Sequence, residues 1–279
     1  MNRRELILGP LKETWPIKKN QLYLLGEWCK LSAEKKFWKN YNFKILDYHW
    51  NDRKKLKQDF IYLQQKNQKL LIYFKEHLNK LHNLNYSEKS WLSILGPWLM
   101  TSIAALYDRW SSINSALNNE IISKVKISKF IKDEVVPFNM EHFSNLIKTD
   151  EWNFLIFSMI IKNFEHHDIK NVKIVNHKSN FKNKLNYNDK NIQNNIFLLK
   201  CYNFISKLND SVIYNINLNW KDRIKLIIFE KNIPFVFKIK NISTSSINFK
   251  LRKNLFSNMI VSDEFDSILI KVLPYLIPQ

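Results

Sequence analysis

The sequence predicts an α/β protein with a doubly wound, mostly parallel sheet and long helices. Short apolar runs near the start have the length of buried strands, the next long segment has helical periodicity, and strand-like runs return after residue 170. Strands that alternate with helices indicate a parallel sheet, because each crossover helix covers the sheet. We predict a single domain over residues 1–279, with a motif-bearing part at 1–155 and a loop-rich part at 170–279.

Three apolar runs predict the first strands. They occupy residues 5–9, 21–26 and 43–48, and each precedes a cluster in which Trp stands among acidic or basic residues. In parallel α/β sheets, ligands bind beyond the carboxyl ends of the strands. The repeated placement of these clusters therefore predicts a ligand site at that edge.

Two long helices should follow. Apolar residues recur on one helical face from Lys54 to about Leu84, and Asn85 with Glu88 has the spacing of a capping box for the next helix. The segment from Ser90 to Tyr107 has no charged residue, but Gly96-Pro97 interrupts it. These features favour a buried core helix over a membrane span.

The second half of the chain has weaker signals. An apolar helix is expected at residues 150–164 and a strand at 171–175, and the Asn/Lys-rich stretch 177–195 is typical of a surface loop. Further strand-like alternation occurs at residues 196–208, 211–216, 233–239 and 265–273.

The chain is strongly basic. Its 44 basic and 25 acidic residues give a formal net charge of +19, which would attract nucleic acid, nucleotides or an anionic membrane face. No RNA-recognition signature or zinc finger is present, so nucleic-acid binding is a minor alternative. Cys29 and Cys201 have no paired spacing, which indicates a reducing compartment. The first residues do not resemble a signal peptide, and we expect a cytoplasmic protein.

The sequence contains no recognised phosphate-binding or metal-binding motif. Only 3 glycines are present, which excludes a P-loop and a dinucleotide fingerprint. His166 and His167 are adjacent, and no pattern of Cys, Asp or Glu completes a metal site around them. We therefore expect neither a metal ion nor a resident cofactor.

Tryptophan is concentrated near the amino terminus. Seven of the 9 tryptophans lie in the first 110 residues. The flat indole face suits sugars, whereas a buried indole N–H needs a partner, so each Trp could instead belong to the core. As a set, the clusters favour a ligand cleft. The expected substrate-binding residues are Glu13, Trp15, Trp28, Trp50, Arg53, Trp98 and Arg109.

His49 is the leading candidate for a catalytic base. A histidine can take a proton from a sugar hydroxyl, and Asp52 would orient its ring. Glu27 is the second candidate, because a carboxylate beside an indole can have a raised pKa. The alternatives are a structural histidine at a strand end and a surface acid. Arg53 and Arg109 would hold anionic groups, although Asp108 and Arg109 could instead form only a local ion pair.

Taken together, the clusters resemble the amino-terminal half of the LIC12162 family of transferases, which are encoded among bacterial O-antigen and other surface-polysaccharide genes. The resemblance covers residues 5 to about 155, and Leu273–Pro278 resembles the family's mid-chain junction. Its six motifs are Glu13-Thr14-Trp15-Pro16, Leu25-Gly26-Glu27-Trp28-Cys29, Tyr48-His49-Trp50-Asn51-Asp52-Arg53, Gly96-Pro97-Trp98-Leu99, Asp108-Arg109-Trp110 and Asp150-Glu151-Trp152-Asn153.

The resemblance implies a glycosyltransferase-like enzyme of the GT-B type, in which two Rossmann-like halves face a cleft. Family members are roughly twice this length, so the chain would be the acceptor half and its carboxy-terminal donor domain would be missing. The nucleotide-sugar donor would be a substrate rather than a cofactor. The chain would then be one half of a split enzyme, a truncated remnant, or a non-catalytic binding or scaffold subunit of the same pathway.

The resemblance also implies partners and a location. The expected partners are a saccharide or lipid-linked saccharide acceptor and a separate donor-domain chain. The positive charge suits peripheral contact with the anionic inner face of the cytoplasmic membrane. A basic nucleic-acid-binding protein is the remaining alternative.

Overall fold

The computed structural model describes residues 4–17, 21–129, 135–164, 171–175, 212–214, 221–222, 224–225, 228, 235–237 and 247–279. The chain divides into two compact units, one formed by Met1–Leu185 with Ser246–Gln279 and the other by Asn186–Ser245. In the smaller unit, β6 (Val212–Tyr214) and β7 (Phe235–Phe237) pair in parallel. The single domain and the missing donor domain stay predictions.

The larger unit is built on a five-stranded sheet in which every pairing is parallel and the order is β3-β2-β1-β4-β5. This confirms the α/β fold with a parallel, Rossmann-like sheet. The chain runs outward from β1 to β3 and then returns to the other side of β1, which creates a topological switch point between β1 and β4. The strands are β1 (Arg4–Ile7), β2 (Leu22–Leu24), β3 (Phe43–Ile45), β4 (Ile122–Ser128) and β5 (Asn171–Val175).

Two long antiparallel helices connect β3 to β4. They are α2 (Arg53–His82) and α3 (Glu88–Asn119). Asn83, in the left-handed region with φ 52°, ends α2. The predicted capping box of Asn85 and Glu88 is wrong, because the hydroxyl of Ser87 accepts the Ser90 N–H at 3.1 Å and makes Ser87 the N-cap.

Helix α3 contributes one buried face to the core, as the sequence predicts, whereas Ile94 and Met100 of the same helix are 55% and 52% exposed. Trp98, Leu99 and Ile103 are at most 4% exposed. In the part of the chain that the structure describes, no helix is long and apolar enough to span a membrane.

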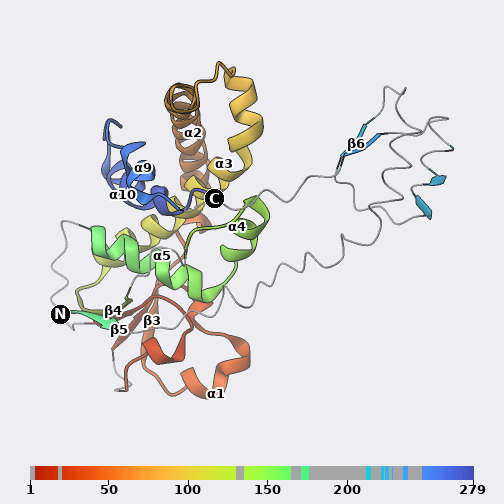
Figure 1. Cartoon of the computed structure of the whole chain (residues 1–279). Coiled ribbons are helices and arrows are strands. Elements are labelled where there is room, and N and C mark those ends of the chain that lie inside the picture. The colour runs from red at the N-terminus through yellow and green to blue at the C-terminus, as the bar shows by residue number, and fades with distance from the viewer. Residues whose placement is uncertain are drawn as a thin grey trace. The chain divides into compact units, whose positions relative to one another are not determined.

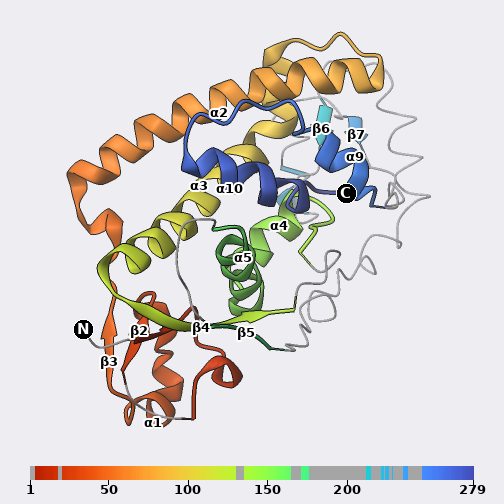
Figure 2. The ribbon, with the colours of Figure 1, turned by 90° about the vertical axis from the view of Figure 1, so that its left-hand side faces the viewer.

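Shorter helices complete the larger unit. In both views, α5 lies above the strands and α1 below them (Figures 1 and 2). The α-helices are α1 (Lys35–Trp38), α4 (Met140–Leu146), α5 (Asp150–Asn163), α9 (Phe249–Asn254) and α10 (Glu264–Val272). The 3-10 helices are η1 (Lys12–Thr14), η2 (Glu27–Cys29), η3 (Ser32–Glu34), η4 (His49–Asn51) and η8 (Leu273–Tyr275).

The strand-like signal at residues 265–273 is the clearest error in the predicted elements. The segment forms α10, because Phe265, Ile268, Leu269 and Val272 recur at helical spacing and are all buried. The predicted strand at 171–175 is confirmed as β5, and those at 211–216 and 233–239 contain β6 and β7. The predicted loop at 177–195 and strand at 196–208 lie outside the described residues.

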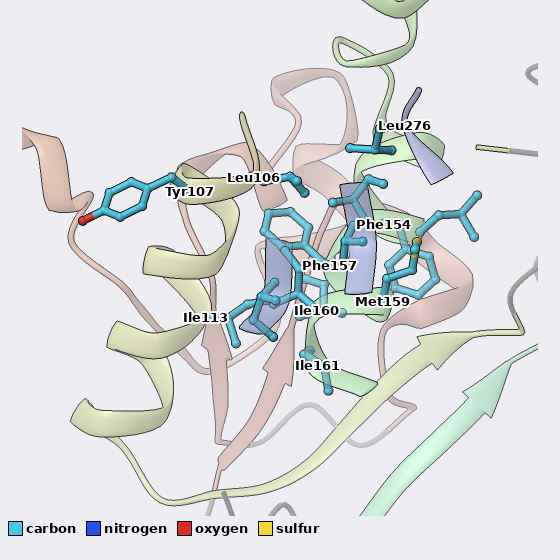
Figure 3. Packing of buried hydrophobic residues seen from close by; sticks show 14 of the residues in the cluster. Leu106, Tyr107, Ile113, Phe154, Phe157, Met159, Ile160, Ile161 and Leu276 are labelled. Atoms are coloured by element: carbon cyan, nitrogen blue, oxygen red, sulfur yellow. The ribbon is translucent and has the colours of Figure 1, made fainter. Parts of the chain in front are cut away.

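The core lies where α3, α5 and the carboxy-terminal helices meet above the sheet. α5 packs on β4 and α3, and α10 packs on α3 and α5. Figure 3 shows Leu106 and Ile113 of α3, Phe154 and Ile160 of α5, and Leu276 after η8 within this cluster. These contacts place one end of α5 and the middle of α3 at the carboxyl edge of the sheet.

Candidate functional site

A cavity of about 750 Å³ lies where β1, β2 and β3 end. Its walls include Leu8–Pro10 after β1, Gly26–Trp28 after β2, and Ile45–Tyr48 with Asn51 after β3. The structure therefore has a cavity at the edge where the sequence predicts a ligand site. The remaining walls come from α3, from α5 and from the turn before α5, through Asp108, Arg109, Lys148, Asp150, Asn153 and Phe157.

Trp28 provides much of the aromatic wall. Its ring is parallel to that of Phe157, with centroids 6.4 Å apart, and meets the ring of Tyr48 edge-on. A Cβ atom at Gly26 would overlap the Trp28 ring, so the absence of a side chain there permits this position of the indole. The indole Nε1 is buried and has no hydrogen-bond partner among the described residues. Such an unpaired donor costs about 1–3 kcal/mol.

Asp108 of α3 is the carboxylate that lies beside His49. The hydroxyl of Tyr48 donates to its Oδ1 at 2.9 Å, and Nε2 of His49 lies 3.7 Å from the same oxygen. Asp108 lines the cavity, whereas the His49 side chain is only 4% exposed and does not. His49 can therefore act on a ligand in the cavity only through Asp108 or after a movement of its ring.

The local environment sets the protonation of both aromatic neighbours of Asp108. Burial lowers the pKa of His49 below its ordinary value, and Lys55 adds to this, although Asp108 opposes it. A neutral imidazole is thus favoured near pH 7, and neither ring nitrogen has a hydrogen-bond partner among the described residues. Burial and the nearby Asp108 raise the pKa of Tyr48, so its hydroxyl remains a hydrogen-bond donor.

Arg109 has acceptors within the protein for its whole guanidinium group. Nε and Nη2 donate to Oδ1 of Asn153 at 2.9 and 2.6 Å. Nη1 donates to the carbonyl of Ala105 at 2.9 Å and to Asp108 at 3.4 Å, and Nη2 also reaches the carbonyl of Ile147 at 3.5 Å. Burial lowers the pKa of Arg109. Its geometry is that of a structural clamp between α3 and the start of α5.

Of the other predicted residues, Glu27 lines the cavity. Its side chain is 75% exposed and pairs with Lys30 at 2.8 Å. Trp50 lies outside the cavity lining, and its Nε1 donates to Asp59 of α2 at 2.9 Å. Asp59 also accepts the hydroxyl of Tyr107 at 2.8 Å, so Trp50 belongs to a buried polar network that joins η4, α2 and α3.

Asp52, Arg53 and Glu13 also lie outside the cavity lining. Asp52 is the N-cap of α2 and accepts the backbone N–H of Lys54 at 2.8 Å. The sequence predicts Asp52 as the acid beside His49, but in the structure that acid is Asp108. Arg53 and Glu13 are exposed, in the first turn of α2 and in η1.

Trp15 and Trp98 are core residues. Each is 4% exposed and neither lines the cavity. The indole of Trp15 donates to the carbonyl of Gly9 at 3.0 Å, and that of Trp98 donates to the carbonyl of Leu276 at 2.9 Å. The sequence left open whether each Trp lines a cleft or belongs to the core, and these two belong to the core.

Several cavity residues are absent from the predicted site. A sequence signal could have indicated Asp108, since it is the first charged residue after the uncharged run from Ser90 to Tyr107. Asp150 and Asn153 stand in a recognised cluster, whereas nothing in the sequence distinguishes Lys148. The other lining residues absent from the prediction include Asp47, Tyr48, Asn51 and Phe157.

Within the described ranges, no group of His, Cys, Asp and Glu side chains is arranged to hold a metal ion. Cys29 is buried and lies outside the cavity lining, and burial raises the pKa of its thiol to about 12.

The parallel sheet and the cavity at its carboxyl edge define a Rossmann-like α/β protein with a cavity in the position where that class binds ligands. The model of the LIC12162 family transferase matches residues 4–279. The chain therefore belongs to the LIC12162 family of transferases, which confirms the resemblance seen in its motifs. Neither a curated protein nor a solved structure matches the chain.

Proposed function

We propose that the chain is the acceptor-binding part of a bacterial glycosyltransferase that acts in the assembly of surface polysaccharide such as O-antigen. Membership in a transferase family supports group transfer. The observation that carries the choice of a saccharide is the cavity itself, in which the aromatic rings of Trp28, Tyr48 and Phe157 stand among carboxylates. Aromatic faces pack on the apolar faces of sugars, and carboxylates accept hydrogen bonds from sugar hydroxyls.

The proposed reaction transfers a sugar from a nucleotide-sugar donor to an acceptor hydroxyl. A bond forms between the acceptor oxygen and the anomeric carbon, the bond from that carbon to the phosphate oxygen of the nucleotide breaks, and the hydroxyl proton must leave. We assign the proton to the pair of Asp108 and His49. Asp108 reaches the cavity, and the neutral imidazole of His49 lies 3.7 Å from its carboxylate. Glu27, at the exposed rim, is the second candidate base.

The donor site is proposed to lie in a separate chain or domain. The 3 glycines of this sequence form no Gly-rich phosphate loop, and the guanidinium of Arg109 is occupied by Asn153 and backbone carbonyls. The same observations fit the second candidate, a non-catalytic binding or scaffold subunit. The net charge of +19 supports peripheral attachment at the anionic inner face of the cytoplasmic membrane.

The test combines binding and transfer. The purified chain is titrated calorimetrically with UDP-, GDP- and CMP-linked sugars, and labelled transfer to lipid-linked acceptors is measured with the same donors and a membrane extract. We expect no donor to bind the isolated chain, and transfer to appear only when chain and extract are combined. Micromolar binding of a donor would contradict the acceptor assignment. Transfer that proceeds equally with His49→Ala/Asp108→Asn would support the scaffold role instead.

A further inference from the structure

The cavity has the opposite charge to the rest of the chain. Four acidic side chains and two basic ones line it, although the chain carries a formal charge of +19. Such a local reversal changes which ligand can enter, because nearby charges act more strongly than distant ones that solvent screens. The acidic residues are Glu27, Asp47, Asp108 and Asp150, and the basic ones are Arg109 and Lys148.

Of the two basic groups, only one has donors to offer a ligand. The guanidinium of Arg109 already donates to Asn153, Ala105, Asp108 and Ile147. Recognition of a phosphate or carboxylate by Arg normally uses two parallel free N–H groups, and these donors are occupied. Lys148 is exposed and is the remaining cation of the described lining.

Two of the acidic groups retain their acceptor capacity. Asp47 and Asp150 make no hydrogen bond or ion pair with the described residues, whereas Glu27 pairs with Lys30 and Asp108 accepts from Tyr48. Asp47 follows β3 and Asp150 begins α5, so they approach the cavity from different elements. Free carboxylate oxygens accept from hydroxyl and ammonium groups and repel anions.

We propose that this cavity binds a saccharide unit that is uncharged or carries an amino group, and that it discriminates against phosphate and carboxylate substituents. The inference rests on the proposed function, since it names the substrate class of the same site. Asp47 and Asp150 set the charge preference, and the aromatic wall of Trp28 contacts the sugar ring. A donor diphosphate, and the phosphate of a lipid carrier, then lie outside this cavity.

The test uses probes of one ring shape and different charge. Binding of methyl glucoside, glucosamine, glucuronate and glucose 6-phosphate, with the corresponding galacto series, is followed by saturation-transfer NMR on the full chain. We expect the neutral and amino sugars to bind at least about tenfold more tightly than the anionic ones at low salt, and the ratio to shrink in high salt. An anionic sugar that binds as tightly as its neutral counterpart overturns the inference.

Charge-neutralising variants provide the second readout. Asp47→Asn/Asp150→Asn should bring the anionic sugars to within about threefold of the neutral ones, because the repulsion is removed. Glu76→Gln is the matched control, since this exposed acid of α2 is outside the cavity lining and its loss should leave the ratio unchanged. An unchanged ratio in the double variant overturns the inference.

The two proposals fail in different ways. If saccharides bind but charge makes no difference, the inference fails and the proposed function stands. If no sugar of either series and no lipid-linked acceptor binds, the proposed function fails, and the inference fails with it.

Discussion

Nε2 of His49 lies 3.7 Å from Oδ1 of Asp108, which brings the turn after β3 against the middle of α3. The same oxygen accepts the hydroxyl of Tyr48 at 2.9 Å. Tyr48 therefore holds this carboxylate at the cavity by a hydrogen bond, His49 packs beside it, and Arg109 ties that part of α3 to Asn153 of α5. The position of Asp108 depends on all three contacts.

Asp108→Asn should lower transfer by about 10²–10⁴-fold, because the amide cannot take the proton of the acceptor hydroxyl. Tyr48→Phe keeps the carboxylate and serves as the control, with a much smaller effect. The measurement is kcat/KM for labelled transfer. Since burial lowers the pKa of His49 below its ordinary value of about 6.5, the acid limb of the pH profile should fall below pH 6.5. A limb that persists unchanged in His49→Gln would remove His49 from the proposed pair.

The same substitution at two tryptophans should have opposite effects on stability. Trp28→Phe removes a buried N–H that has no partner among the described residues, so the free energy of unfolding should stay constant or rise by about 1 kcal/mol. Trp15→Phe leaves the carbonyl of Gly9 without its donor and should lower that free energy by about 1–3 kcal/mol. Urea denaturation measures both changes.

Trp28→Ala is the corresponding test of binding. Loss of the ring that lines the cavity should weaken saccharide binding by about tenfold, in line with the about 0.5–1.5 kcal/mol that aromatic contacts contribute. Trp98→Phe is the control, because Trp98 is buried and outside the lining. Equal losses of binding in the two variants would mean that Trp28 acts only through stability.

Asp59→Ala should lower the free energy of unfolding by about 2–4 kcal/mol. The substitution removes the acceptor of Trp50 and of Tyr107, and each buried donor left unpaired costs about 1–3 kcal/mol. Glu76→Ala on the same helix is exposed and should change the free energy by less than about 0.5 kcal/mol. Chemical denaturation followed by Trp fluorescence makes the comparison, and a neutral Asp59→Ala would rule out a stabilising network.

Acid should weaken the contact between α2 and α10. Burial alone would raise the pKa of Asp263, but the N–H of Asp266, Lys66 and Tyr62 hold it below its ordinary value. A carboxyl with a depressed pKa stabilises the fold above its unfolded pKa of about 3.9, and this contribution is lost as pH falls through the folded pKa. The free energy of unfolding should therefore decline from about pH 5 downward.

Lys66→Met isolates this effect. Near pH 7 the variant should be less stable by about 3–5 kcal/mol, because Asp263 and the buried Asp266 lose their cation at 3.0 and 2.6 Å. The difference from the parent chain should narrow as pH falls through the folded pKa of Asp263, because a protonated Asp263 no longer attracts the cation. Lys12→Met breaks an exposed pair with Glu34 and a cation–π contact with Phe37, and it provides the control at the surface. A difference that stays constant with pH would contradict the assignment.

The sequence predicted the edge of the sheet at which the cavity lies, because that edge follows from strand order and from the turns that end the strands. It did not predict β4, in which the partly buried lysines Lys124 and Lys126 interrupt the buried apolar residues and obscure the strand pattern. For α10 the sequence predicts a strand, because its four buried residues at helical spacing also form a short apolar run that is typical of a strand.

Individual site residues were harder to predict than the site. Asp52 is next to His49 in sequence, but as the N-cap its carboxylate is directed to the backbone of α2, and the acid that reaches the imidazole comes from a distant helix. Trp15, Trp28 and Trp98 stand in similar clusters, and only tertiary packing decides which indole faces the cavity. These are long-range contacts that neither periodicity nor spacing encodes.

The pairing of Trp98 with the carbonyl of Leu276, and of Lys66 with Asp263, has a consequence for synthesis on the ribosome. Helices α2 and α3 leave the exit tunnel long before α10 and η8, which follow the whole of the smaller unit. During that interval the nascent chain exposes the apolar side of α3 and a lysine without its counterion. Such surfaces attract chaperones and make incomplete chains prone to aggregate. Translation of the segment from Asp263 to Leu276 is therefore the step that completes these contacts of the larger unit.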